Sequence, residues 1–198
     1  MRRAVWTIVA TLGLLVAAPA WAHVGVGPIS GFPSGVLHPL SGADHWVAMV
    51  AVGIWARFLG GRGILTVPLG FVASMALGSL VGVHGRAALW TETGILASLL
   101  FFGLALLLPL RLTTWLGSTL VTVFAFFHGH AHGAEIPPGR AGWAYIVGFV
   151  ATTVLLHLLG ILLGEGLLRG GDRLRRRHRL VRLAGLGVLM LGVGGVLA

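Results

Sequence analysis

The stretch HPLSGADHWVAMVAVGIWA, residues 38–56, places two histidines and an aspartate at the start of an apolar run that ends only at Arg57. A run of this length is close to the roughly 20 apolar residues that a helix needs to cross a bilayer. Charged side chains cost about 2.5–3.5 kcal/mol each at the centre of a membrane helix on insertion scales, so ionisable groups persist there where they pair, bind a ligand or conduct an ion. The stretch therefore predicts a membrane helix whose polar end has a function.

The composition of the whole chain is that of a polytopic membrane protein. Of the 198 residues, 57% are hydrophobic and 10% are charged, whereas a soluble domain carries roughly 25% charged residues. Six apolar segments, each bounded by Arg, Gly or Pro, follow one another with short connections. They cover residues 36–57, 63–83, 89–110, 113–133, 142–165 and 180–197. We expect an all-α bundle of six transmembrane helices within residues 23–198 and no soluble domain.

Residues 1–22 are predicted to be a cleaved signal peptide. MRR is a basic n-region, AVWTIVATLGLLVAA is an apolar h-region, and AWA at residues 20–22 is an A-x-A cleavage site. Cleavage would make His23 the mature N-terminus, outside the cytoplasm, although an uncleaved signal anchor is the alternative. With six spans after the cleavage site, both mature termini are expected on the periplasmic side of a bacterial cytoplasmic membrane.

The distribution of basic residues predicts the orientation of the bundle. All 14 are arginines, and seven of them lie between residues 169 and 182. With the mature N-terminus outside, the inner loops hold ten arginines and the outer loops two, which agrees with the positive-inside rule. The net charge of +9 therefore reflects topology and contact with anionic lipid rather than binding to nucleic acid.

The first polar motif spans the outer end of the first apolar segment. His38 is expected near the outer surface and His45 two helical turns deeper on the same face, with Asp44 turned about 100° away from His45. Pro39 and Gly42 lie among these polar residues. Such a combination indicates a broken or unwound helix start, which is a common setting for an intramembrane ion site.

The second polar motif, FHGHAHGAE, closes the fourth apolar segment, also on the outer side. His128, His132 and Glu135 have the spacing i, i+4, i+7 and share one stripe of a helix, whereas His130 points to another side. Small residues recur every fourth position in the second segment, from Gly70 to Gly82, and predict close helix packing. Gly160 and Gly164 in the fifth segment also predict close helix packing.

Two motifs that meet on one side of the membrane suggest that the chain handles a metal. Imidazole and carboxylate suit first-row divalent ions such as Ni²⁺, Co²⁺, Zn²⁺ and Cu²⁺, and the chain has no cysteine to supply thiolate. The residues expected to bind such a cation, as a transported substrate and with no tightly bound cofactor, are His38, Asp44, His45, His128, His130, His132 and Glu135. Candidates for a secondary metal path are His23, His84, Glu92, His157 and Glu165. For the last two, interhelical hydrogen bonds to Ser or Thr are an equal alternative.

Together the two motifs resemble those of the HupE/UreJ family, small membrane proteins found with hydrogenase and urease gene sets. The family pattern is H-P-x-x-G-x-D-H in the first helix, and its second polar motif closes on H-G-x-E. The matching residues are His38, Pro39, Gly42, Asp44 and His45 for the first, and His132, Gly133 and Glu135 for the second. The resemblance implies a passive permease for nickel, or for cobalt, that supplies hydrogenase or urease maturation.

Two other functions stay open from the residues alone. Three histidines and a carboxylate can hold Zn²⁺ with an open position for an activated water, as in an intramembrane hydrolase that acts on a lipid amide or ester. The other is a metal sensor or a scaffold for a partner protein. The expected partners are the cation and membrane lipid, then a second copy of the chain or a cytoplasmic metallochaperone, and no nucleic acid.

Overall fold

The computed structural model describes residues 31–84, 89–108, 112–136, 140–168 and 174–197. Within these ranges the chain forms seven α-helices and no strand, so the expected all-α class is confirmed. The helices are α2 (Gly31–Ser41), α3 (Ala43–Leu59), α4 (Gly63–Gly82), α5 (Leu89–Leu107), α6 (Thr114–Glu135), α7 (Arg140–Leu168) and α8 (Leu174–Leu197). The predicted signal peptide and His23 lie outside the described residues.

Three described stretches are long and apolar enough to cross a membrane, namely Gly63–Gly82, Trp90–Leu107 and Gly142–Leu168. Shorter apolar helical stretches cover His45–Leu59 in α3 and Val181–Gly194 in α8. α3 is short because the chain breaks ahead of it, α8 begins with a run of arginines, and α6 ends in the polar second motif. Among the described residues, each of the six predicted apolar segments is mainly helical, and three of the helices have the length and hydropathy of a complete span.

The helix break predicted around Pro39 and Gly42 lies at Gly42. This glycine has extended backbone angles, φ −109° and ψ 124°, between the end of α2 at Ser41 and the start of α3 at Ala43. Its carbonyl accepts the backbone N–H of His45 at 3.2 Å. Pro39 is buried inside α2, where it lacks the N–H that a helix interior needs. The first polar motif is therefore divided between two helices.

Helices α4 and α6 pack through small residues along most of their length. The predicted small-residue face of α4 is confirmed. Ser74 Oγ donates to the Thr122 carbonyl at 2.6 Å, and a Cβ added to Gly78 would overlap the backbone of α6. On the opposite side of the contact, a Cβ on Gly129 would overlap the backbone of α4. This contact fixes the rotation of α6, and with it the direction of the histidines in its last two turns.

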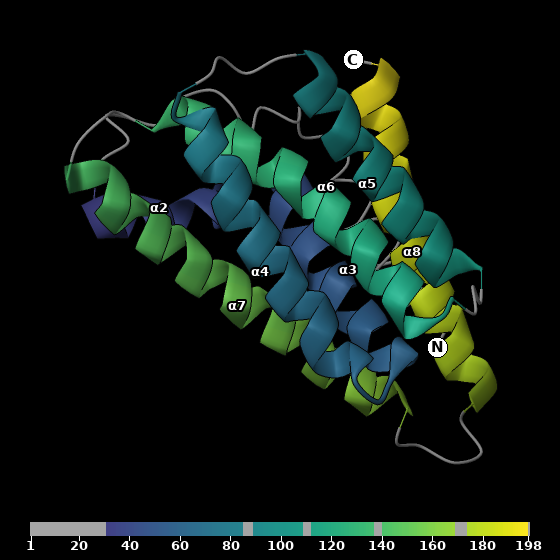
Figure 1. Ribbon diagram of the computed structural model, residues 1–198. Helices are drawn as coiled ribbons and strands as arrows, with labels where there is room; N and C mark the ends of the chain where they lie inside the picture. The colour runs from purple at the N-terminus through teal and green to yellow at the C-terminus, as the bar shows by residue number, and fades with distance from the viewer. Residues whose placement is uncertain (1–30, 85–88, 109–111, 137–139, 169–173, 198) are drawn as a thin grey trace.

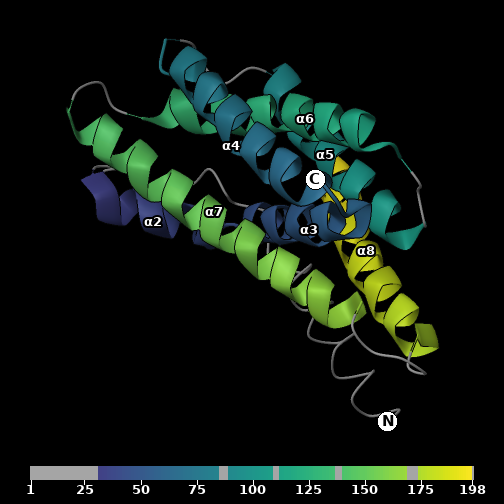
Figure 2. The same cartoon turned by 60° about the horizontal axis from the view of Figure 1, so that its bottom comes forward.

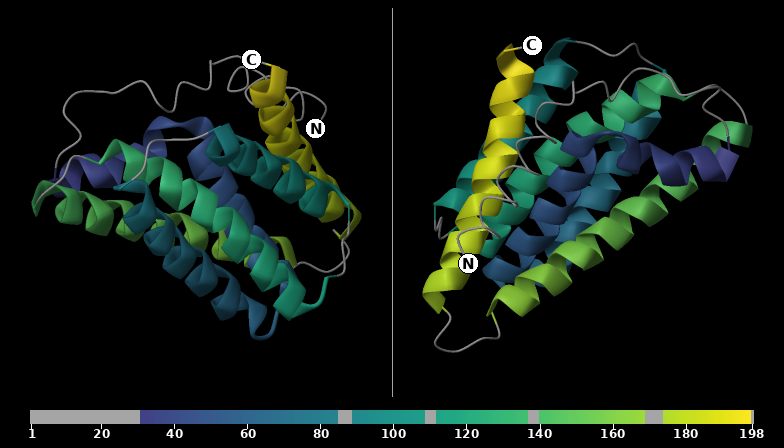
Figure 3. Two further views of the ribbon diagram at one scale, coloured as in Figure 1. Left: turned by 45° about the horizontal axis from the view of Figure 1, so that its top comes forward. Right: turned by 180° about the vertical axis from the view of Figure 1, so that it is seen from behind.

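Helix α3 is the centre of the bundle and contacts every other described helix. It packs most closely on α7, where Gly53 faces Gly160, and the α5–α8 pair meets at Gly103 and Gly185. Figure 1 shows α4 and α6 between α7 on one side and the α5–α8 pair on the other. Figure 2 and the right-hand view of Figure 3 show α3 between α7 and α8. Side chains on α3 are thus placed in the interior.

The outer surface of the bundle is apolar, whereas histidines lie inside. Large exposed aliphatic side chains project from α4 and α7, among them Leu65, Leu69, Leu77, Leu155 and Leu162. Many exposed aliphatic side chains of this kind suit lipid tails rather than water. The arrangement supports a membrane protein whose mainly apolar interior also holds several histidines.

Candidate metal-handling site

Four histidines from the two motifs meet in the interior, at the contact of α2, α3 and α6. We call His38, His45, His128 and His132 the histidine cluster. The ring centroid of His132 lies 4.7 Å from that of His38 and 4.7 Å from that of His45, and the rings of His45 and His128 are 5.7 Å apart. The two motifs, more than 80 residues apart in sequence, therefore form one site.

The helix break brings the two histidines of the first motif together. In one continuous helix, seven residues separate side chains by about 10.5 Å along the axis. With the break at Gly42, the ring centroids of His38 and His45 are 6.4 Å apart. The broken helix start predicted for this motif is thus confirmed, and His38 and His45 do not share one face of a single helix.

The pair His38 and His132 shares a hydrogen bond, with His38 Nε2 2.8 Å from His132 Nδ1. A bond between two ring nitrogens needs one protonated and one bare nitrogen, because neutral imidazole carries one of each. These two nitrogens satisfy one another as long as no cation is bound. A metal ion that binds either of these two nitrogens must break the hydrogen bond between them.

The tautomer of His128 follows from its contact with Ser98 on α5. Ser98 Oγ donates its only proton to the Ile95 carbonyl at 2.6 Å. The same oxygen lies 2.9 Å from His128 Nε2, so it accepts a hydrogen bond from the Nε2–H. His128 then has its lone pair on Nδ1. A metal-binding histidine is usually oriented in this way, by a hydrogen bond from its second nitrogen.

The surroundings of the histidine cluster are dry and aromatic. His45, His128 and His132 are at most 1% exposed. Two side chains of α7 cover the cluster: the Phe149 ring is 4.4 Å from His132, and the Tyr145 ring is 5.6 Å from His38. Burial of polar groups in such a place costs free energy unless they find partners, and His38 with His132 and His128 with Ser98 do so.

His130 lies away from the cluster, as its position between His128 and His132 predicts. Its Nδ1 is 3.1 Å from Thr91 Oγ1, and its ring centroid is 4.5 Å from that of Trp90. Both partners belong to the first turn of α5. His130 is thus part of the α5–α6 contact. Of the five histidines predicted to bind the cation, the other four form the cluster.

The predicted carboxylates flank the cluster along the chain. Asp44 precedes His45 in the first turn of α3, and Glu135 is the last residue of α6. The side chains of both lie outside the described part of the structure. Glu92 is half-buried in the first turn of α5, and His84 is exposed just beyond α4. Among the side chains that are described, no group of three or more His, Cys, Asp or Glu is arranged to hold a metal ion.

The two inner candidates on α7 have different surroundings. Glu165 forms an ion pair with Arg57 of α3, which gives it a structural role between these helices. His157 is 1% exposed, and neither of its ring nitrogens has a hydrogen-bond partner among the described residues. The alternative of an interhelical bond from His157 to Ser or Thr is therefore not found in this part of the structure.

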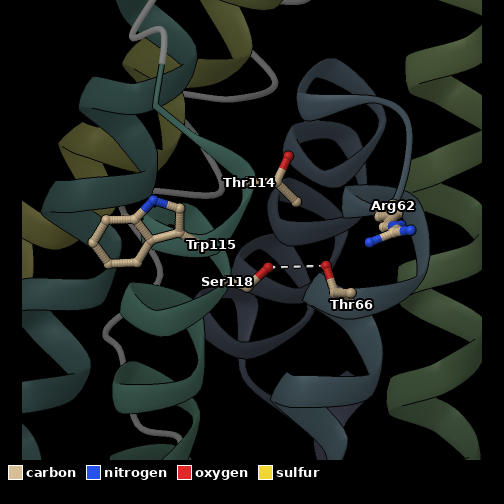
Figure 4. Close-up of a pocket in the computed structure, with 5 residues that line it drawn as sticks. All are labelled: Arg62, Thr66, Thr114, Trp115 and Ser118. Carbon is tan, nitrogen blue, oxygen red and sulfur yellow. Dashed lines mark hydrogen bonds between the residues drawn. The ribbon is translucent and has the colours of Figure 1, made fainter.

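A surface pocket of about 500 Å³ lies at the other end of α4 and α6, near their first turns. Its lining residues are Arg62, Thr66, Thr114, Trp115 and Ser118, with Thr66 and Ser118 hydroxyls 2.9 Å apart (Figure 4). The histidines of α6 lie in its last two turns, so this pocket is not part of the cluster.

Several residues that contact the cluster were not expected from the sequence. They are Phe71 on α4, Ser98 on α5, and Tyr145 and Phe149 on α7. Each of them lies within an apolar helical segment, where its neighbours in sequence do not mark it as part of a site. Only the polarity of Ser98, within the apolar stretch ILASLLFF, offered a signal.

Two comparisons with known proteins point to the same family. The family model described as HupE / UreJ protein matches residues 10–195. A curated relative, Protein HupE of Rhizobium leguminosarum bv. viciae, is 40% identical over 186 residues, which cover 93% of this chain and 94% of the relative. No solved structure matches this chain.

Proposed function

The chain belongs to the HupE/UreJ family, and on that basis we propose that it is a secondary, passive permease for a divalent transition-metal ion. The ion is Ni²⁺ or Co²⁺, and it supplies hydrogenase or urease maturation. The cation is the transported substrate and not a resident cofactor.

The observation that carries the proposal is the meeting of four imidazoles from three helices, three of them at most 1% exposed. Neutral imidazole is a good ligand for Ni²⁺ and Co²⁺. The sequence puts Asp44 directly before His45 and Glu135 three residues after His132. Their negative charges would offset the charge of a cation that leaves water for this site.

The hydrogen bonds of the cluster also favour transport over storage. His38 and His132 satisfy one another, and Ser98 satisfies one nitrogen of His128, while no cation is bound. A cation that binds His38 Nε2 or His132 Nδ1 must displace the bond between them, which lowers the net gain on binding, whereas the bond from His128 to Ser98 can stay in place. Conduction needs binding that is strong enough for capture and weak enough for release.

The topology that we propose has six spans with the histidine cluster in the outer half. Ten arginines on the inner loops and a signal peptide at residues 1–22 support this orientation. Both mature termini are then periplasmic, in a bacterial cytoplasmic membrane. The exposed leucines of α4 and α7 face lipid.

The test is uptake of radiolabelled Ni²⁺ into proteoliposomes. We expect the wild-type protein to accelerate uptake, and Asp44→Ala and His45→Ala to abolish it. The control is Met49→Ala, one turn further along α3 and as deeply buried as His45, which makes a similar cavity without removing a ligand. Loss of uptake in Met49→Ala equal to that in His45→Ala, or normal uptake in both motif variants, would refute the proposal.

The same preparation separates the permease from a zinc hydrolase. A hydrolase requires one tightly bound, stoichiometric zinc with an open coordination position. We expect the purified permease to contain less than one metal ion per chain. Stoichiometric zinc together with no uptake would favour the hydrolase.

A further inference from the structure

His157 is a buried imidazole that the histidine cluster does not use. It lies on α7, and its side chain is 1% exposed. Neither ring nitrogen has a hydrogen-bond partner among the residues that the structure describes. An unpaired polar group at such depth destabilises the fold, and an apolar side chain of similar size would not. Packing therefore does not account for an imidazole at this position.

The ring of Phe71 on α4 connects His157 with the histidine cluster. The Phe71 centroid is 4.8 Å from that of His157 and 6.1 Å from that of His128. The two histidines thus contact the same aromatic ring from different helices. Figures 1 and 2 show α4 and α7 as neighbours along this part of the bundle.

The position of His157 along α7 places it inward of the cluster. Tyr145 and Phe149, earlier on the same helix, contact His38 and His132. His157 follows Phe149 by eight residues, which is about 12 Å along a helix axis. A further eight residues lead to Glu165, at the end of α7 that lies beside Arg57.

Two further donor groups lie one turn from the contact of Phe71 with His157. Met75 follows Phe71 by one turn of α4, and Thr153 precedes His157 by one turn of α7. Thr153 Oγ1 is 3.9 Å from Met75 Sδ, and both side chains are fully buried. The α4–α7 contact therefore offers an imidazole, a thioether and a hydroxyl, which together suit a borderline divalent ion better than Mg²⁺ or Ca²⁺.

We propose that His157 is a second, inner binding position for a divalent transition-metal cation, reached from the histidine cluster past Phe71. This inference rests on the proposed permease function and adds a step to it. The cation leaves His128 and is bound by a His157 nitrogen before it reaches the inner end of α7. A single imidazole with weak additional donors holds the cation only briefly, as a step of a passive route requires.

The first test is His157→Phe, which keeps a ring of similar size and removes both nitrogens. In proteoliposomes we expect the maximal rate of Ni²⁺ uptake to fall at least tenfold, while the Ni²⁺ concentration at half-maximal rate changes less than threefold. The control is Leu158→Phe, the neighbouring exposed residue on the lipid-facing side. Wild-type uptake in correctly reconstituted His157→Phe would overturn the inference and leave the permease proposal intact.

The second test does not depend on transport. Because the chain has no cysteine, His157→Cys introduces a single thiol in the whole protein. We expect Cd²⁺ to protect this thiol from alkylation, and Mg²⁺ not to protect it. If vesicles with the wild-type protein take up neither Ni²⁺ nor Co²⁺, the permease proposal fails. The alkylation of His157→Cys then tests by itself whether a cation binds at position 157. Protection supports it, and equal alkylation with and without Cd²⁺ overturns it.

Discussion

Replacement of Ser98 by alanine would remove the acceptor of the His128 Nε2–H without touching any predicted metal ligand. In the wild-type protein the proton of Ser98 is committed to the Ile95 carbonyl, so the hydroxyl oxygen fixes the Nδ1 lone pair of His128. Ser98 is fully buried and His128 is 1% exposed. Water is therefore not expected to replace the lost acceptor.

The size of the effect follows from the state of His128 when a cation is bound. Without a cation, the ring of the alanine variant can move its proton to the other nitrogen. With a cation on Nδ1, Nε2 must keep its proton and stays buried without an acceptor. Such a group costs about 1–3 kcal/mol, which corresponds to a roughly 5- to 150-fold loss of cation affinity. Ser98→Thr keeps the hydroxyl and should stay within about threefold of wild type.

Two measurements on purified protein check this prediction. Titration with Co²⁺, followed by its visible spectrum, gives the affinity of wild type, Ser98→Ala and Ser98→Thr. Nitrogen NMR of labelled histidine reports whether the Nε2–H form of one histidine is lost in Ser98→Ala. Unchanged affinity together with a changed tautomer would refute the view that this lone pair binds the cation. An unchanged tautomer would refute the assignment of the hydrogen bond itself.

Three further predictions concern stability. Gly129→Ala places a methyl group against the Met75 carbonyl and forces α4 and α6 apart, so we expect the free energy of unfolding to fall by about 1–3 kcal/mol. The control is Gly166→Ala, whose Cβ meets open space. Equal melting temperatures of the two variants in detergent would contradict the packing described here. In a double-mutant cycle, Arg57→Gln and Glu165→Gln should couple by about 0.5–1 kcal/mol, because the pair is only partly buried; strict additivity would mean that the ion pair contributes nothing. Chelation of metal by EDTA should leave the melting temperature unchanged, because His38 and His132 satisfy one another without a cation; a large decrease would indicate a resident structural metal.

The sequence predicted those features that depend on local pattern. Small residues at every fourth position predicted the close face of α4, because only Gly and Ser allow backbones to approach in that way. Gly42 among polar residues predicted the break that separates α2 from α3. The shared outer side of the two motifs predicted their meeting, since ionisable groups at membrane depth need partners.

Contacts between distant helices could not be predicted in the same way. The bond between Ser98 and His128 and the ion pair between Arg57 and Glu165 each depend on how two helices rotate against each other. That rotation is set by backbone contacts such as Gly53 with Gly160, and helical periodicity within one segment does not contain it. Helical periodicity turned His130 away from His128 and His132, but for the same reason the sequence could not identify α5 as the helix that it contacts.

X-ray absorption at the nickel edge of Ni²⁺-loaded protein would count the imidazoles that bind the cation. We predict that the wild-type site has histidine ligands from both polar motifs, so that His45→Ala and His132→Ala each remove one imidazole and weaken binding at least tenfold. A spectrum without imidazole scattering, or one that is unchanged in either variant, would contradict a shared site for the two motifs.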